Sequence, residues 1–250
     1  MTDVLKIGGN QLDDTTFIGG LAHTTGQLVQ QGQPPVIVHG GGKLISALQQ
    51  KFGIEPRTIG GLRVTDADSL LIVMMVLIGQ VNPTLVSALQ QAGVEAEGLN
   101  GADRGLLHAD PLTHPDGDLG YVGRITAVRA PVIREVLARS VVPVIAPLGV
   151  GADGGFFNVN ADQAAGAIAA AIDAERVTFV TNVPGVLADG QTINRLSQAG
   201  AHELIRSGVA SGGMAVKLQA AFTALAAGVP GARITDLRGL SEGSGTLIVQ

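Results

Sequence analysis

Short apolar segments that end in glycine clusters alternate with longer helical patterns along this sequence. The segment "VLKI" (4–7) runs into Gly8-Gly9, "VIVH" (36–39) runs into Gly40-Gly41-Gly42, and a helical pattern follows each cluster. Strands that alternate with helices are typical of a parallel sheet, because each crossover helix covers a face of that sheet. We therefore predict an α/β fold in which an open, mainly parallel central sheet is sandwiched by helices.

The same alternation places the remaining elements. Between residues 94 and 129 the density of Gly, Asp and Pro predicts hairpins on one side of the sheet. We expect two tightly packed lobes, residues 1–173 and 174–250, because no linker separates them. Helices are predicted near residues 12–32, 43–52, 66–79, 82–92, 131–139, 161–173, 198–207 and 213–227, and further strands at 141–146, 177–181, 232–236 and 246–250.

Composition excludes several classes of function. Hydrophobic residues make up 46% of the chain and charged residues 15%, which is typical of a globular protein with a large core. The net charge of −5 and the lack of a basic block argue against a nucleic-acid or membrane surface. Without cysteine there is no disulfide, thiolate metal site or cysteine nucleophile. The N-terminal sequence has no signal-peptide pattern, so we expect a cytoplasmic protein.

One segment, "LLIVMMVLIG" (70–79), is apolar around the whole circumference of a helix. Ten residues are too few to span a bilayer, which needs about 20. A helix of this kind must be covered on all sides, either as a core helix or as a helix shared between two subunits. We favour the subunit interface, because of the resemblance described below.

The glycine clusters after two consecutive strands predict a site for a polyanion. Ligands of open α/β sheets lie beyond the carboxyl ends of the strands, where helix N-termini and bare backbone N–H groups attract anions. The P-loop pattern is not met, because Gly42-Lys43 is followed by Leu44 instead of a hydroxyl residue. Lys43 is accordingly interpreted as a solvated residue at the start of a helix.

A second glycine pattern, Gly149-x-Gly151-x-x-Gly154, matches the dinucleotide fingerprint only in its letters. That fingerprint leads directly from a strand into a helix, whereas "GFFNVNAD" intervenes here. The segment "FFNVNADQAA" (156–165) predicts an N-cap at Asn160, with Asp162 favourable near the positive end of the helix dipole. Asn158 lies two residues before Asn160, so both side chains are expected to face one ligand.

The chain has only four lysines, and two of them stand out. Lys6 interrupts an apolar strand just before a glycine pair, a costly place for a charge that has no anion to meet. Lys217 lies in the first turns of a helix that begins with two glycines. Arg63 also follows a glycine pair and is suited to a carboxylate, although a surface ion pair is an equal alternative. His39 is as compatible with packing as with function.

These residues belong to motifs that occur together in one family. In order and spacing, the motifs resemble the amino acid kinase family across nearly the whole chain: "KIGGN", "VIVHGGGK", "GLRVTD", "VNP", "FNVNADQAA", "TNVPGVL", "SGGMAVK" and "SGTLIV". The resemblance implies the family's fold, ATP with Mg²⁺ as co-substrate, and phosphorylation of the γ-carboxylate of N-acetyl-L-glutamate, the second step of arginine biosynthesis. The N-terminal lobe would hold the acyl amino acid and the C-terminal lobe ATP.

The resemblance also assigns roles to residues. Lys6 and Lys217 are expected to stabilise the transition state, with Asp162 orienting both lysines. Gly8 and Gly9 would bind phosphate, while Gly41, Gly42, Arg63, Asn158 and Asn160 would bind the substrate. No residue is predicted to bind a metal ion. The nucleotide would be bound by Asn182, Val183, Pro184, Gly185, Val186, Leu187, Val209, Ala210 and Ser211.

The resemblance further implies a homodimer formed through the helix at 66–79, of the short, arginine-insensitive kind. A PII-type regulator is possible in this family, but no motif here supports one. Three alternatives stay open: a kinase of carrier-protein-linked 2-aminoadipate in lysine biosynthesis, a nucleotide-binding module without catalysis, and, as a distant third, a nicotinamide oxidoreductase.

Overall fold

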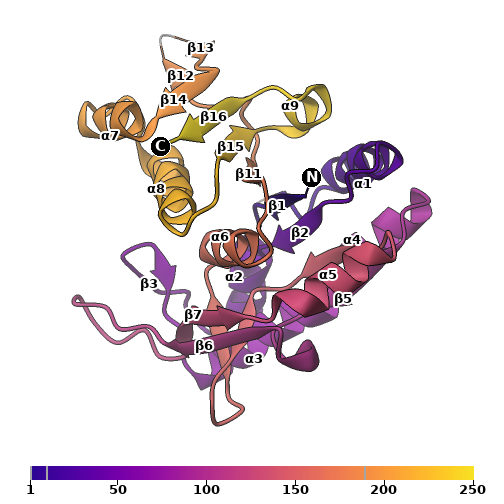
Figure 1. The fold of residues 1–250 in the computed structure, drawn as a ribbon. Helices are drawn as coiled ribbons and strands as arrows, with labels where there is room; N and C mark the ends of the chain where they lie inside the picture. The colour runs from indigo at the N-terminus through magenta and orange to yellow at the C-terminus, as the bar shows by residue number, and fades with distance from the viewer. Residues whose placement is uncertain (1, 10, 189) are drawn as a thin grey trace.

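An open eight-stranded sheet forms the centre of the computed structural model, which describes residues 2–9, 11–188 and 190–250 (Figure 1). The strand order is β14-β16-β15-β11-β1-β2-β8-β5, and only the β15–β16 pair is antiparallel. The predicted α/β class is confirmed. The strands are β1 (Asp3–Ile7), β2 (Val36–His39), β5 (Ala96–Leu99), β8 (Val142–Ile145), β11 (Arg176–Val180), β14 (Arg195–Ser197), β15 (Ala232–Thr235) and β16 (Thr246–Val249).

An apolar layer lies on each face of the sheet and packs against the helices that cover that face. In β1, Val4 packs into the layer with α5, α6 and α8, whereas its neighbour Leu5 packs into the layer with α1, α3 and α4. This alternation follows from the two-residue period of a strand and explains why the central strands are apolar throughout. The helices are α1 (Thr15–Gln30), α2 (Gly42–Lys51), α3 (Ala67–Val76), α4 (Asn82–Gln91), α5 (Ala130–Ala138), α6 (Ala161–Ala171), α7 (Gln198–Arg206), α8 (Gly212–Ala226) and α9 (Leu237–Glu242).

Beside the main sheet, four short strands close into a small barrel. Its strands are β6 (Leu107–Pro111), β7 (Val122–Val128), β9 (Leu148–Val150) and β10 (Phe156–Val159). The antiparallel β6–β7 pair confirms a hairpin within residues 94–129, although β5 of the same region joins the main sheet. Unpredicted two-stranded ribbons are β3 (Thr58–Ile59) with β4 (Leu62–Arg63), and β12 (Leu187–Ala188) with β13 (Gln191–Thr192).

The predicted separate helices at 66–79 and 82–92 are instead one continuous helical segment. Between α3 and α4 lies a π-helical turn, η1 (Leu77–Val81), and Pro83 follows at the start of α4. Proline has no N–H group for the preceding turn, and a widened π turn lets the helix continue past it. The predicted gap between the two helices, at residues 80 and 81, is therefore wrong.

The combined segment Ala67–Gln91 has 25 residues and a mean hydropathy of 1.9 in its most apolar window. It is long and apolar enough to cross a membrane, so the length argument made for residues 70–79 alone does not apply to it. However, 44% of that window is buried inside the protein, and the core helix of a globular enzyme has the same properties. This helix is consequently weak evidence for a membrane span.

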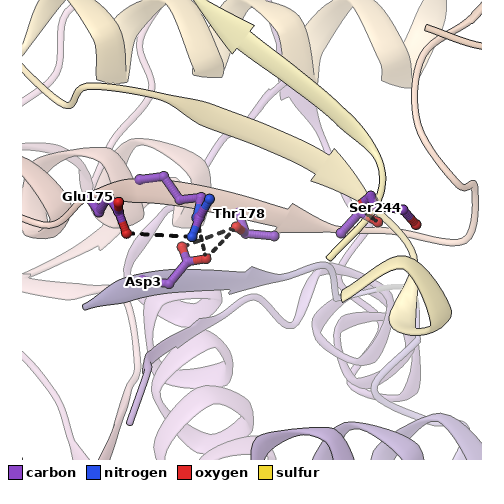
Figure 2. A network of polar contacts seen from close by, with 6 residues as sticks. Asp3, Glu175, Thr178 and Ser244 are labelled. Atoms are coloured by element: carbon purple, nitrogen blue, oxygen red, sulfur yellow. Dashed lines mark hydrogen bonds and ion pairs between the residues drawn. The ribbon is translucent and has the colours of Figure 1, made fainter. Parts of the chain in front are cut away.

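A half-buried polar cluster joins β1 to β11 at the amino ends of these strands (Figure 2). Asp3 accepts hydrogen bonds from Thr178 Oγ1 (2.9 Å) and from Arg176 Nε (3.0 Å), and Glu175 lies 3.6 Å from the same guanidinium. Burial raises the pKa of Asp3 to about 6, in opposition to Arg176, Thr178 and Arg233, which lower it. The first strand is thereby joined to β11 through a carboxyl group whose pKa is raised to about 6.

Asp3 should make stability depend on pH. Between its ordinary pKa of 3.8 and about 6, the folded state keeps the proton that the unfolded state has lost. The free energy of unfolding should therefore fall by about 3 kcal/mol as the pH rises through this window. Urea unfolding of the wild type and Asp3→Asn at pH 4 to 7 measures this term, because the variant cannot titrate. If the free energies of unfolding of the two proteins changed in parallel with pH, the raised pKa of Asp3 would be contradicted.

Candidate active site

The two predicted glycine turns lie side by side at the carboxyl edge of the sheet. Because β1 and β2 are parallel neighbours, with Ile7 opposite His39, the chain turns at the same level after both strands. A Cβ atom at Gly9 would lie 2.6 Å from the nitrogen of Gly42 and 2.7 Å from that of Gly41. Only glycine fits this contact, and the pairing of the two clusters predicted from sequence is present.

The amide groups of this turn are available to a ligand. In the part of the chain that the structure describes, the N–H groups of Gly41 and Gly42 donate to no acceptor, whereas that of Gly40 donates to Ile7 O at 3.0 Å. Gly42 is also the first residue of α2, so the positive end of the helix dipole adds to the two N–H groups. An anion is the ligand that such a turn binds.

Lys6 and Asp162 form an ion pair beside the glycine turns. Lys6 Nζ lies 2.8 Å from Asp162 Oδ1, and the side chains are only 12% and 14% exposed. Asp162 is in the first turn of α6, where the side chain of the N-cap Asn160 accepts a hydrogen bond from its N–H at 2.9 Å. The predicted N-cap is confirmed, and it fixes the direction in which Asp162 enters the site.

Lys217 approaches this pair from α8. Burial lowers its pKa, the nearby positive charge of Lys6 lowers it further, and Asp162 acts in the opposite direction. Its Nζ donates only to Gly213 O within the described residues, at 3.3 Å. Lys6 is therefore ion-paired with Asp162 and Lys217 lies near that pair, so both ammonium groups retain N–H donors for another anion.

Arg63 is held rigidly at the opposite side of the glycine turn. The guanidinium donates to Gly42 O at 2.9 Å, to Ser46 Oγ at 2.8 Å and to Gln49 Oε1 at 2.5 Å. Gln49 in turn donates to Ser69 Oγ at 2.9 Å, in a buried contact. Burial lowers the pKa of Arg63 without removing its charge at neutral pH.

Asn158 reaches the same region from β10, as alternation along the strand predicted. Its Nδ2 donates to Thr65 Oγ1 at 3.0 Å, and its backbone N–H donates to Tyr121 O at 2.8 Å. The side-chain amide is thus oriented by Thr65, and its carbonyl oxygen is left for another donor. Lys43, by contrast, is 57% exposed and pairs with Asp13, which agrees with its interpretation as a solvated residue.

These side chains surround one cleft of about 560 Å³. Its lining also includes residues that the motifs did not predict, such as Gln11, Thr58, Gly61 and Thr181. Thr58 and Gly61 belong to the β3–β4 ribbon, for which the glycine pair before Arg63 was an available signal. The predicted residues that line the cleft are Lys6, Gly8, Gly9, Gly41, Gly42, Arg63, Asn158, Asn160, Asp162, Asn182 and Lys217.

Most of the predicted nucleotide residues lie outside this cleft. Side chains of Val186 and Ala210 are buried in the core, so only their backbones could meet a ligand. Leu187 and Val209 are 40% and 54% exposed, respectively, and offer apolar surface. The remaining residues outside the cleft are Val183, Pro184, Gly185 and Ser211.

The glycine turns, the Lys6–Asp162 ion pair and the nearby Lys217 lie together at the carboxyl edge of the sheet. This combination is typical of one class of protein. The model of the amino acid kinase family matches residues 1–236, and the chain belongs to this family. Acetylglutamate kinase of Roseiflexus castenholzii is 53% identical to it over 99% of this chain and 94% of the relative. The acetylglutamate kinase of Roseiflexus sp. strain RS-1 is 51% identical over 100% and 94%. A crystal structure of smu.665 from Streptococcus mutans has a TM-score of 0.85 at 33% identity, covering 99% of this chain and 98% of that one.

Proposed function

We propose that the protein transfers the γ-phosphoryl group of ATP to the γ-carboxylate of N-acetyl-L-glutamate and forms N-acetyl-L-glutamyl 5-phosphate, the second step of arginine biosynthesis. The observation that carries this proposal is the Lys6–Asp162–Lys217 cluster beside the free N–H groups of Gly41 and Gly42. The acetylglutamate kinases among its relatives identify the acceptor.

Charge neutralisation is the main task of such a site. A carboxylate acceptor is already ionised at neutral pH, so the reaction needs no general base. The repulsion between acceptor and γ-phosphate is offset by Lys6, Lys217 and the glycine N–H groups, which face the oxygens of the transferring group. Asp162 keeps the two ammonium groups together in the absence of substrate.

Magnesium would enter with the nucleotide. The described residues contain no cluster of three or more His, Asp or Glu side chains suited to a metal ion. Mg²⁺ commonly binds through one or two carboxylates together with substrate phosphates. The cleft, whose lining carries the carboxylate of Asp162, would fit Mg²⁺ held chiefly by the phosphates of ATP. The ion supplies further positive charge to the phosphates. The residues from Asn182 to Leu187 and from Val209 to Ser211 are proposed to bind the nucleotide in the lobe formed by residues 174–250.

Arg63 is proposed to bind the α-carboxylate of the substrate, with Asn158 and Asn160 on the other side. Arg63→Lys should raise the KM for N-acetyl-L-glutamate about 10- to 100-fold, because one directed charged hydrogen bond contributes about 1.5–3 kcal/mol. The KM for ATP should stay unchanged, since all of the predicted nucleotide residues except Asn182 lie outside the cleft that Arg63 lines. Initial-rate kinetics with each substrate varied test this. Arg57→Lys, an exposed change just before β3, is the control, and an equal effect on both KM values would contradict the role.

The helix α3 is proposed to form a homodimer interface. Leu71 and Met75 lie one turn apart on it and are 55% and 54% exposed, an apolar pair that calls for a partner surface. Light scattering should give twice the chain mass of 25.4 kDa, and the double variant Leu71→Glu with Met75→Glu should give a monomer. A monomeric wild type would refute the dimer.

We further propose a cytoplasmic enzyme that binds neither nucleic acid nor a membrane.

The proposed reaction is tested by initial rates of ADP release from MgATP with three acceptors. Turnover is expected with N-acetyl-L-glutamate and not with L-glutamate, which lacks the acetyl group. Turnover only with carrier-linked 2-aminoadipate would keep the chemistry and assign the enzyme to lysine biosynthesis. No turnover with any acceptor would favour the module without catalysis.

A further inference from the structure

The polarity of the glycine turn depends on where its carbonyl groups point. The carbonyl of Gly41 accepts a hydrogen bond from Ile45 N at 2.9 Å, and that of Gly42 accepts one from Arg63 Nη2 at 2.9 Å. Both carbonyls are therefore held by donors of the protein, while the N–H groups of the same residues donate to no acceptor among the described residues. If one of these peptide groups were rotated by about 180°, its carbonyl oxygen would face the anion in place of its N–H group. The interaction would then be repulsive instead of attractive.

The third carbonyl, that of Gly40, is held by His39. His39 Nδ1 lies 3.0 Å from Gly40 O, and His39 Nε2 lies 3.2 Å from Nδ2 of Asn82. Asn82 Nδ2 also donates to Val144 O at 2.8 Å. His39 is completely buried and Asn82 is 8% exposed.

This chain of contacts allows only one arrangement of protons. Val144 O can only accept, so the nitrogen of the Asn82 amide faces it, and the second N–H of that nitrogen points to His39 Nε2. Nε2 must then be an acceptor, and the proton of the neutral imidazole is on Nδ1, where it is donated to Gly40 O. Burial lowers the pKa of His39 to about 4, which agrees with a neutral ring.

The π turn η1 places Asn82 in this position. Asn82 N donates to Leu77 O, five residues earlier, and the Leu77 side chain packs so closely on Gly41 that a Cβ there would lie 2.7 Å from it. In a regular α-helix, residues five apart point about 140° away from each other. The wider turn brings Leu77 and Asn82 toward one side, where Leu77 packs on Gly41 and Asn82 contacts His39.

We propose that Asn82 and His39 are positioning residues: Asn82 fixes the Nδ1-protonated tautomer of His39, and His39 holds the Gly40 carbonyl away from the anion bound by Gly41 and Gly42. The consequence for catalysis rests on the proposed phosphoryl transfer, whereas the tautomer does not. Neither residue is among those that line the cleft. A π turn in the proposed dimer helix thereby supports the cradle from behind.

The tautomer is tested by ¹⁵N NMR of the imidazole groups in the full-length wild type at pH 7, with His39→Asn used to assign the signal. A neutral ring with the proton on Nδ1 is expected. In Asn82→Asp the carboxylate can only accept from Nε2, so the signal should change to an Nε2-protonated or doubly protonated ring. A wild-type ring protonated on Nε2 would overturn the proposal, whatever the activity of the enzyme.

The positioning role is tested by two variants of His39. His39→Leu removes the donor to Gly40 and should lower kcat about 10- to 100-fold, less than the loss of a direct oxyanion donor. His39→Asn places an amide N–H where Nδ1 was, and its kcat should be at least about tenfold higher than that of His39→Leu. A role in packing alone predicts the reverse, because leucine suits a buried site better than asparagine.

The outcomes of these experiments are distinct from failure of the proposed function. Equal kcat values for the two variants, with an active wild type, would overturn the positioning role. An inactive wild type would refute the proposed function instead, and the NMR measurement would still decide the tautomer. Thermal melting should show that His39→Leu is no less stable than His39→Asn. The lower kcat expected for His39→Leu would then not result from lower stability.

Discussion

Lys217→Ala is expected to lower kcat about 100- to 1,000-fold while the KM values for both substrates change little. Burial disfavours the charge of its ammonium group in the resting site, Lys6 repels that charge, and Asp162 attracts it. The benefit of this charge is greatest when negative charge accumulates between donor and acceptor, as it does in phosphoryl transfer. The loss should accordingly appear in kcat.

Full initial-rate kinetics of Lys217→Ala and of Lys51→Ala measure this effect. Lys51 is an exposed lysine at the end of α2, outside the cleft, so its removal controls for net charge and surface entropy. A Lys217→Ala enzyme with an unchanged kcat and a raised KM would show that the lysine only binds substrate. In that case, the transition-state role assigned to it would be wrong.

Gly9→Ala should reduce kcat/KM at least about 100-fold, because the added methyl group enters the cradle. A Cβ atom at this position would lie 2.6 Å and 2.7 Å from the two amide nitrogens that we assign to the anion. Both nitrogens belong to the backbone and cannot turn aside as a flexible side chain could. The glycine turns would have to separate, and the N–H groups would lose their shared direction.

Gly19→Ala is the matched control for this substitution. Gly19 lies on the exposed side of α1, and no atom stands within 4 Å of its virtual Cβ. The change should leave activity intact and stabilise the helix by about 0.5–1 kcal/mol. Circular dichroism of both variants separates misfolding from a local effect. A folded Gly9→Ala enzyme with normal kinetics would refute the cradle.

Much of this site could be predicted because its chemistry leaves local signatures. A lysine in an apolar strand, glycines at the ends of neighbouring strands, and an asparagine N-cap before Asp162 each depart from what packing alone requires. Parallel pairing of β1 with β2 then brings the glycine clusters together, so the strand pattern was enough to predict a shared anion site.

The parts that were missed depend on contacts between distant segments. Nothing local indicates that Asn82 faces His39 across 43 residues, or that the helix continues past Pro83 through a π turn. Likewise, the raised pKa of Asp3 needs the pairing of the first strand with β11, 173 residues away from it in sequence. The nucleotide residues illustrate the same limit, since their motif does not reveal which side chains turn into the core.

The central claim is that this cleft makes an acyl phosphate, and trapping that product tests it most directly. The enzyme is incubated with MgATP, N-acetyl-L-glutamate and hydroxylamine, and the γ-hydroxamate is quantified against the ADP released. The mechanism predicts one hydroxamate for each ADP, and almost none with Lys217→Ala. Release of ADP without hydroxamate would mean that water or another group accepts the phosphoryl, and would contradict the account.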